Sequence, residues 1–91
     1  MKRVHVVARG VVQGVGFRWS TARQAERRDV AGWVRNVGSD RVEAELEGSD
    51  TAVDAVVAWM HSGPVGSRVD GLEVDDADPQ GDSTFEVRAS I

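Results

Sequence analysis

The residues best suited to do chemistry lie in one glycine-rich segment, GVVQGVGFR at positions 10–18. Glycines at 10, 14 and 16 allow positive φ angles and a tight bend, in which successive amide N–H groups can converge on an anion. Arg18 follows at once, and its planar guanidinium can hold two phosphate oxygens and neutralise their charge. If a helix begins there, its unpaired first amides and its dipole favour the same anion. The segment therefore predicts a cradle for a phosphate-like group.

This segment matches neither of the common nucleotide-binding motifs. Its glycine spacing is not G-x-G-x-x-G, and no Gly-Lys-Ser/Thr follows. The spacing alone therefore leaves a second interpretation open, in which the glycines only permit a tight connection and Arg18 extends into water.

The elements that must position this segment can be predicted from periodicity. Alternating apolar residues indicate strands over 4–8, 33–36 and 42–46, with turn residues at 38–40. Residues 19–29 favour a helix. A second helix is expected to begin after Ser49 or Asp50 and to stop at Gly63-Pro64, with Val53, Val56, Val57 and Met60 as its apolar face.

Two further strands are expected over 68–75 and 84–89, which completes the order of elements. The order βαββαβ, to which one extra strand can be added, is typical of the ferredoxin-like, or split βαβ, class of α+β domains. We expect one domain over residues 1–91, with a mostly antiparallel sheet and both helices on one face. The fold hosts many functions and does not decide this one.

Composition limits the class of partner. The formal charge of −4 argues against broad attraction to nucleic acid or anionic membranes. The absence of cysteine excludes disulfides and thiolate chemistry and favours a reducing cytoplasm. No segment approaches the roughly 18 apolar residues of a membrane span, and the N-terminus does not read as a signal peptide. A monomer is the default expectation.

Two motifs together resemble those of a known family. The segment at 10–18 resembles the signature loop of acylphosphatases, and GWVRN at 32–36, followed by a glycine, resembles their second motif. The distance between the motifs and the remaining pattern, including the strand FEVR at 85–88, also fit. The resemblance covers nearly the whole chain.

The resemblance implies hydrolysis of acyl phosphates, which are mixed carboxylic–phosphoric anhydrides, without metal or cofactor. It implies two catalytic residues, Arg18 on the phosphoryl group and Asn36 on the attacking water. The phosphate would also be held by the loop amides, at Gln13, Gly14, Val15, Gly16, Phe17 and Arg18. Because Asn is a poor base, we hypothesise that a substrate phosphate oxygen takes the water's proton. The tail Ala89-Ser90-Ile91 departs from the family pattern, which bears on packing rather than on chemistry.

Other functions remain open at this point. The main alternative is a non-catalytic module of the same fold that binds phosphate or another small anion. Asn36 could serve only as a turn residue. An RNA-binding version is disfavoured, since the central strands carry Val, Arg and Glu rather than stacking aromatics. A domain that hydrolyses carbamoyl phosphate within a larger maturation pathway is a further alternative.

The remaining polar and aromatic residues are interpreted as structural. His5 and His61 show no metal spacing, and His61 suits a helix C-terminus. Trp33 and Trp59 are expected in the core, and packing is preferred for Trp19 over a place at the mouth of the site. Phe17 is expected to anchor the loop from below, and Gln13 and Thr21 are expected to add polar contacts near the phosphate. Solvent-exposed faces are expected at Glu43, Glu45, Glu47 and residues 75–82.

Overall fold

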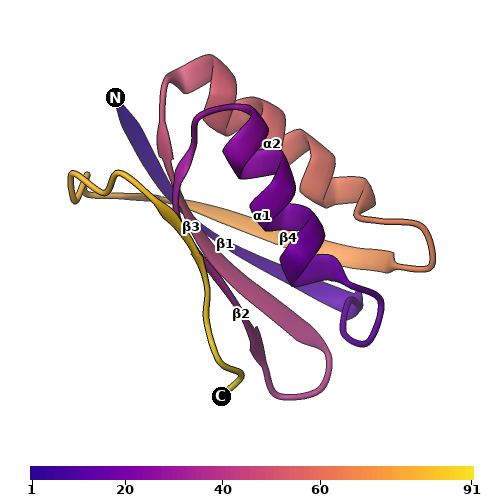
Figure 1. Ribbon diagram of the computed structural model, residues 1–91. Coiled ribbons are helices and arrows are strands. Elements are labelled where there is room, and N and C mark those ends of the chain that lie inside the picture. Colours follow the sequence, from indigo (N-terminus) through magenta and orange to yellow (C-terminus); the bar gives the residue numbers. More distant parts are fainter.

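Five strands form a single sheet and two helices pack against it (Figure 1). The computed structural model describes all residues, 1–91. The elements in chain order are β1 (Lys2–Val11), α1 (Phe17–Arg27), β2 (Ala31–Val37), β3 (Arg41–Gly48), α2 (Asp50–Ser62), β4 (Arg68–Ala77) and β5 (Phe85–Val87).

The strand order in the sheet is β4-β1-β3-β2-β5, and both helices cover the same face (Figure 1). Neighbouring strands are antiparallel except for β2 and β5, which run parallel. The predicted ferredoxin-like α+β class is therefore confirmed, with β5 as a short additional strand at the edge of the sheet.

Strand register places the apolar residues of three strands in rows beneath the helices. Val6 lies opposite Ala44 in β3, and Ala44 lies opposite Val34 in β2. Because side chains alternate between the two faces of a strand, every second residue joins this core. The buried core comprises Val4, Val6, Ala8, Val12, Phe17, Ala25, Val30, Val34, Val42, Ala44, Leu46, Val53, Val56 and Met60.

The second helix begins and ends as predicted. The Ser49 side chain accepts a hydrogen bond from the amide of Ala52 at 3.2 Å, which caps the first turn of α2. Gly63 ends the helix with φ 68°. Neither α1 nor α2 is long and apolar enough to cross a membrane.

The first helix begins at Phe17, two residues before its predicted start. Gly16 precedes it in a left-handed conformation, and its carbonyl accepts the first helical hydrogen bond from Ser20 at 3.0 Å. The sequence pattern placed Arg18 before the helix, whereas the structure places it in the first turn.

Gly10 belongs to β1 and not to the loop that follows, which corrects the sequence analysis. The register of β1 against β4 shifts between Arg9 and Gly10. A Cβ at Gly10 would collide with the carbonyl oxygen of Arg68 in β4. Glycine is thus required here for the close approach of two strands.

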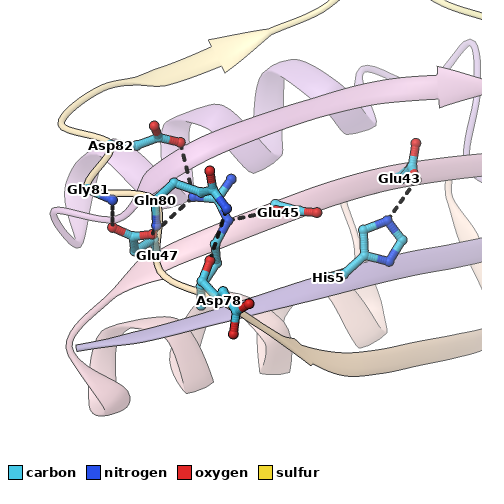
Figure 2. A network of polar contacts seen from close by, with 9 residues as sticks. His5, Glu43, Glu45, Glu47, Asp78, Gln80, Gly81 and Asp82 are labelled. Atoms are coloured by element: carbon cyan, nitrogen blue, oxygen red, sulfur yellow. Dashed lines mark hydrogen bonds and ion pairs between the residues drawn. The ribbon is translucent and has the colours of Figure 1, made fainter.

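The sheet face opposite the helices carries an ion-pair network that the sequence analysis missed (Figure 2). Glu47, expected in solvent, is 1% exposed, and Arg3 beside it is 4% exposed. Arg3 donates to Glu47 at 3.1 Å, to Glu45 at 2.6 Å and to Asp82 at 3.0 Å. The charges that alternate along β3 are therefore paired across strands rather than simply solvated.

The Glu47 carboxylate also holds the connection between β4 and β5 in place (Figure 2). Glu47 accepts hydrogen bonds from the backbone amides of Gln80 at 2.6 Å and Gly81 at 3.0 Å. The acidic stretch predicted as a turn at 75–82 starts later than expected, because β4 continues to Ala77. Backbone amides of this connection are thus paired with a buried glutamate rather than with water.

Trp33, which was expected in the core, is buried at 8% exposed, but it lies outside the core cluster beneath the helices. It pairs with Glu45 of β3, on the face away from the helices. The guanidinium carbons of Arg35 and Arg88 lie 4.9 and 4.8 Å from the centre of its ring, a distance typical of cation–π contacts. The guanidinium groups of two arginines, and not the helices, cover this indole.

Hydrogen bonds set the pKa values of the two best-paired glutamates on this face. The amide of Gln80 contributes most to lowering the pKa of Glu47, and Arg3 and the amide of Gly81 lower it further against the effect of burial. Burial would raise the pKa of Glu43, but hydrogen bonds from His5, at 2.7 Å, and from Arg35, at 2.6 Å, outweigh it and lower the pKa. Both carboxylates favour the ionised form in the folded state.

We expect Glu47→Gln to destabilise the fold at neutral pH. Because the pKa of Glu47 is lower in the folded than in the unfolded state, its contribution is complete above the ordinary value of 4.5 and fades as pH falls through the folded value. The gap in free energy of unfolding between wild type and variant should therefore stay constant from neutral pH down to the ordinary value of 4.5 and narrow at lower pH. Urea unfolding at several pH values measures it.

Glu73→Gln is the matched control, since Glu73 pairs with Arg9 on the same face but both side chains are more than half exposed. Exposed pairs contribute little. Equal effects of the two substitutions at neutral pH would contradict a special role for the buried carboxylate.

Candidate active site

The loop of residues 12–16 carries the chain from β1 to α1 through two left-handed glycines. Gly14 has φ 73° and Gly16 has φ 76°. A residue with a Cβ is strained in this region by about 1–2 kcal/mol. A Cβ at either position would meet no atom within 4 Å. Glycine is therefore needed for the backbone conformation alone, and the space beside both residues is open.

The amides of this loop are free to bind a ligand. None of the backbone N–H groups from Gln13 to Gly16 donates a hydrogen bond to another backbone group. Phe17 and Arg18 form the first turn of α1, where a helix offers no internal acceptor for its amides. No side chain caps this helix. Six consecutive donors therefore sit at the positive end of the helix dipole.

Phe17 anchors the loop in the core, as the sequence analysis predicted. It is 1% exposed, and its ring centre lies 5.6 Å from that of Trp59 in α2. Thr21 is also buried, and its hydroxyl donates to the carbonyl of Phe17 at 2.8 Å. Thr21 does not line the loop cavity, so the structure does not support the predicted polar contact there.

Arg18 is oriented by the C-terminal tail. One of its terminal nitrogens donates to the carbonyl oxygen of Arg88 at 3.1 Å. Arg18 as a whole residue is half-buried, and its guanidinium keeps other donors free. The arginine is therefore tied to the fold rather than free in water.

The tail itself continues along β2 by backbone hydrogen bonds. The amide of Arg88 donates to Val34 at 2.8 Å, and that of Ile91 donates to Asn36 at 3.0 Å. The amide of Gly38 donates in turn to the carbonyl of Ile91 at 3.0 Å. Main-chain pairing holds the tail in place, so the unusual Ala89-Ser90-Ile91 sequence is compatible with an ordered end of the chain.

Gln13 ties the loop to the turn between β2 and β3. Its side-chain amide donates to three carbonyl oxygens, those of Val37 at 3.3 Å, Gly38 at 3.0 Å and Arg41 at 3.0 Å. Its side-chain nitrogen is therefore occupied within the fold, and only its backbone amide remains for an anion. Figure 1 shows the loop, this turn and the C-terminus at the same end of the molecule.

These segments enclose a cavity of about 140 Å³. Asn36 enters it from the end of β2, on the face that the helices cover, since it pairs with Val42 in β3. The lining residues are Val12, Gln13, Gly14, Gly16, Phe17, Arg18, Trp19 and Asn36. The structure thus brings together all predicted site residues except Val15, which packs beside the core and does not line the cavity.

The cavity lining suits a small anion. It contains a guanidinium, unpaired amides and the Asn36 carboxamide, and no Asp, Glu or His. Donors that converge in a partly enclosed space bind an anion more strongly than in bulk water. The Asn36 amide can both donate to a water molecule and accept from it.

The other residues that could do chemistry lie elsewhere. His5 bonds to Glu43 on the opposite face of the sheet, and His61 lies in the last turn of α2. A larger hollow of about 570 Å³ opens at the other end of the sheet, but its charged side chains are all acidic: Glu26, Asp29, Glu47 and Asp82. The smaller cavity is therefore the better candidate for an anion site.

Three contributors to the site escaped the sequence analysis. Val12 lines the cavity, and it continues the apolar series at even positions of β1, which could have revealed it. Trp19, for which packing was preferred, is 63% exposed and stands at the cavity wall, so that preference was wrong. The carbonyl of Arg88 left no signal, because a main-chain contact does not depend on the side chain.

We expect Gly16→Ala to lower the free energy of unfolding by about 1–2 kcal/mol, because alanine is strained at this φ. Gly71→Ala in β4 is the matched control, since a Cβ there also meets open space and the residue does not have a positive φ. Urea denaturation of both variants measures the difference. A Gly16→Ala variant as stable as Gly71→Ala would show that the loop does not require the left-handed conformation.

Comparison with known proteins agrees with this geometry. The family model described as Acylphosphatase matches residues 4–87. An acylphosphatase from Anaeromyxobacter dehalogenans (strain 2CP-C) is 53% identical over 87 residues, which cover 94% of each chain.

Solved structures give the same result. The crystal structure of acylphosphatase from Bacillus subtilis superposes with a TM-score of 0.93 at 32% identity, covering 97% of this chain and 99% of that one. Full-length HypF in its phosphate- and nucleotide-bound form matches with a TM-score of 0.91 at 26% identity, over 98% of this chain and 12% of that protein. By sequence and by fold, this chain belongs to the acylphosphatase family.

Proposed function

We propose that this protein hydrolyses acyl phosphates to a carboxylate and inorganic phosphate, at the cavity between the 12–16 loop and β2. The observation that carries the proposal is the convergence of Arg18, the unpaired loop amides and Asn36 on one cavity of about 140 Å³. Membership of the acylphosphatase family supports it. The cavity is complete within one chain, which favours a monomer acting on a small molecule.

Arg18 and the amides of residues 13–18 would hold the phosphoryl group. Phosphoryl transfer passes through a loose transition state with charge spread over the equatorial oxygens. Fixed donors aimed at such oxygens need no reorganisation as charge develops, and each is typically worth about 3–4 kcal/mol. The Arg88 carbonyl and the Phe17 anchor keep these donors in place.

Asn36 would position the attacking water. The water oxygen bonds to phosphorus, the bond from phosphorus to the bridging oxygen breaks, and the carboxylate leaves with the bonding electron pair. A carboxylate is a good leaving group and requires no general acid. Because the cavity holds no carboxylate or imidazole, we assign the water's proton to a phosphate oxygen, which yields dihydrogen phosphate.

The donor set also underlies the proposed metal independence. Divalent cations such as Mg²⁺ are held by carboxylates and by substrate phosphates. Here the positive charge opposite the phosphate would come from Arg18 and from the helix N-terminus, and the cavity lining has no acidic side chain to hold a cation.

We expect Arg18→Ala to lower kcat/KM for benzoyl phosphate by at least about 100- to 1,000-fold, because it removes a donor to the developing charge. Inorganic phosphate, used as a competitive inhibitor, should bind more weakly to this variant. The assay contains EDTA, and Arg27→Ala, at the far end of the same helix, is the control. Activity that requires added metal would overturn metal independence.

Asn36→Ala should lower kcat by about 100-fold, a typical consequence of losing the orientation of one reactant. The inhibition constant of inorganic phosphate should stay near the wild-type value, because Arg18 and the amides remain. This separation of kcat from phosphate affinity distinguishes water positioning from anion binding. Wild-type turnover in Asn36→Ala would end the water-positioning role, and a wild-type protein that binds phosphate without turnover would be the non-catalytic anion-binding module instead.

A further inference from the structure

An open groove adjoins the candidate active site. It has a volume of about 380 Å³ and lies between α1 and β5, lined by Trp19, Ala22, Arg23, Glu26, Phe85 and Val87. Trp19 also lines the smaller cavity beside Arg18. The indole of Trp19 therefore forms a wall of both the cavity and the groove, and the groove leads away from the candidate phosphate site.

The walls of this groove are mainly apolar. Trp19 and Ala22 are three residues apart in α1 and share a helix face. Phe85 and Val87 are two residues apart in β5 and share a strand face, where both pack against the edge of the core. Four of the six lining residues are therefore hydrophobic.

Trp19 is unusual for its exposure. It is 63% exposed, whereas Trp33 is buried and Trp59 packs against the core. A large aromatic side chain left in solvent at the rim of an apolar groove is typical of a binding surface. Trp19 follows Arg18 in the first turn of α1 and lines the same cavity, so the indole lies next to the candidate anion site.

The chemistry of the substrate links the two spaces. In an acyl phosphate only one bridging oxygen separates the acyl carbon from phosphorus, so the acyl group must lie directly beside the bound phosphate. The groove begins at Trp19, which is in that position. Its volume falls within the usual range for small-molecule sites, about 300–1,000 Å³.

We propose that this groove binds the acyl half of the substrate and selects apolar acyl groups, aromatic ones included, with Trp19 as the residue that determines this specificity. The inference rests on the proposed function, because it assumes that the phosphate occupies the adjoining cavity. An aromatic acyl group is covered by Trp19, Phe85 and Val87, whereas an acetyl group is too short to reach beyond the indole. The charges of Arg23 and Glu26 offset each other, so the groove has no net preference for a second charge.

The first test compares turnover of benzoyl phosphate and acetyl phosphate. We expect wild-type kcat/KM to favour benzoyl phosphate by about 10-fold or more, chiefly through KM, since one or two buried apolar groups discriminate to this degree. Trp19→Ala should reduce the ratio of the two kcat/KM values by a similar factor, and Arg27→Ala should leave the ratio unchanged. Equal ratios in wild type and Trp19→Ala would overturn the subsite and leave the proposed hydrolysis intact.

A second test does not depend on turnover. Phenacylphosphonate and acetonylphosphonate replace the bridging oxygen by carbon and cannot be hydrolysed in the same way. Calorimetry should give about 10-fold tighter binding of phenacylphosphonate to wild type, and this advantage should disappear in Trp19→Ala. That result would support the subsite even in a protein without hydrolase activity, and equal binding of the two phosphonates would refute it.

A third comparison tests the apolar class itself. Succinyl phosphate carries a free carboxylate at the far end of its acyl group, which Arg23 could bind. If succinyl phosphate were preferred over benzoyl phosphate, and Arg23→Ala removed that preference, the groove would select charge and our inference would be wrong. We expect the opposite order, with benzoyl phosphate preferred over succinyl phosphate in both the wild type and Arg23→Ala.

Discussion

The candidate site depends on a loop that must turn the chain from β1 into α1 while its own amides stay unpaired. Unpaired donors destabilise a fold when water cannot reach them, so the loop must remain open on one side and be supported on the others. The left-handed glycines give the turn without side-chain bulk. Phe17 fixes the loop from the core, and Gln13 fixes it to the turn after β2. Because Asn36 belongs to β2, the same support sets its distance from the loop.

Charge is separated across this small domain. The chain is acidic overall, with a formal charge of −4, yet the candidate anion cavity contains no acidic side chain. Acidic residues instead meet arginines on the opposite face of the sheet, as Glu47 and Glu45 meet Arg3, or gather at the other end of the sheet. Since salt screens charges beyond roughly 8 Å, the net charge has little influence on an anion bound beside Arg18.

Much of the fold could be predicted from the sequence because its determinants are local. Alternating apolar residues gave the strands, and the cap at Ser49 and the stop at Gly63 gave the limits of α2. The resemblance of two motifs to those of acylphosphatases singled out Arg18 and Asn36, and the structure brings both to one cavity. Boundaries were less certain where a single left-handed residue decides them, as Gly16 does for the start of α1.

The sequence by itself determined the class of fold, the glycine-rich loop and the side chains available to it. Only the tertiary structure decided which partners those side chains meet. A period of two shows that the residues at 43, 45 and 47 share a face, but not that Arg3, 44 residues from Glu47, closes over it. Likewise, nothing local to Arg18 indicates that a carbonyl 70 residues away orients it. Such contacts depend on strand order and on which sheet face the helices leave uncovered, and both are properties of the assembled sheet.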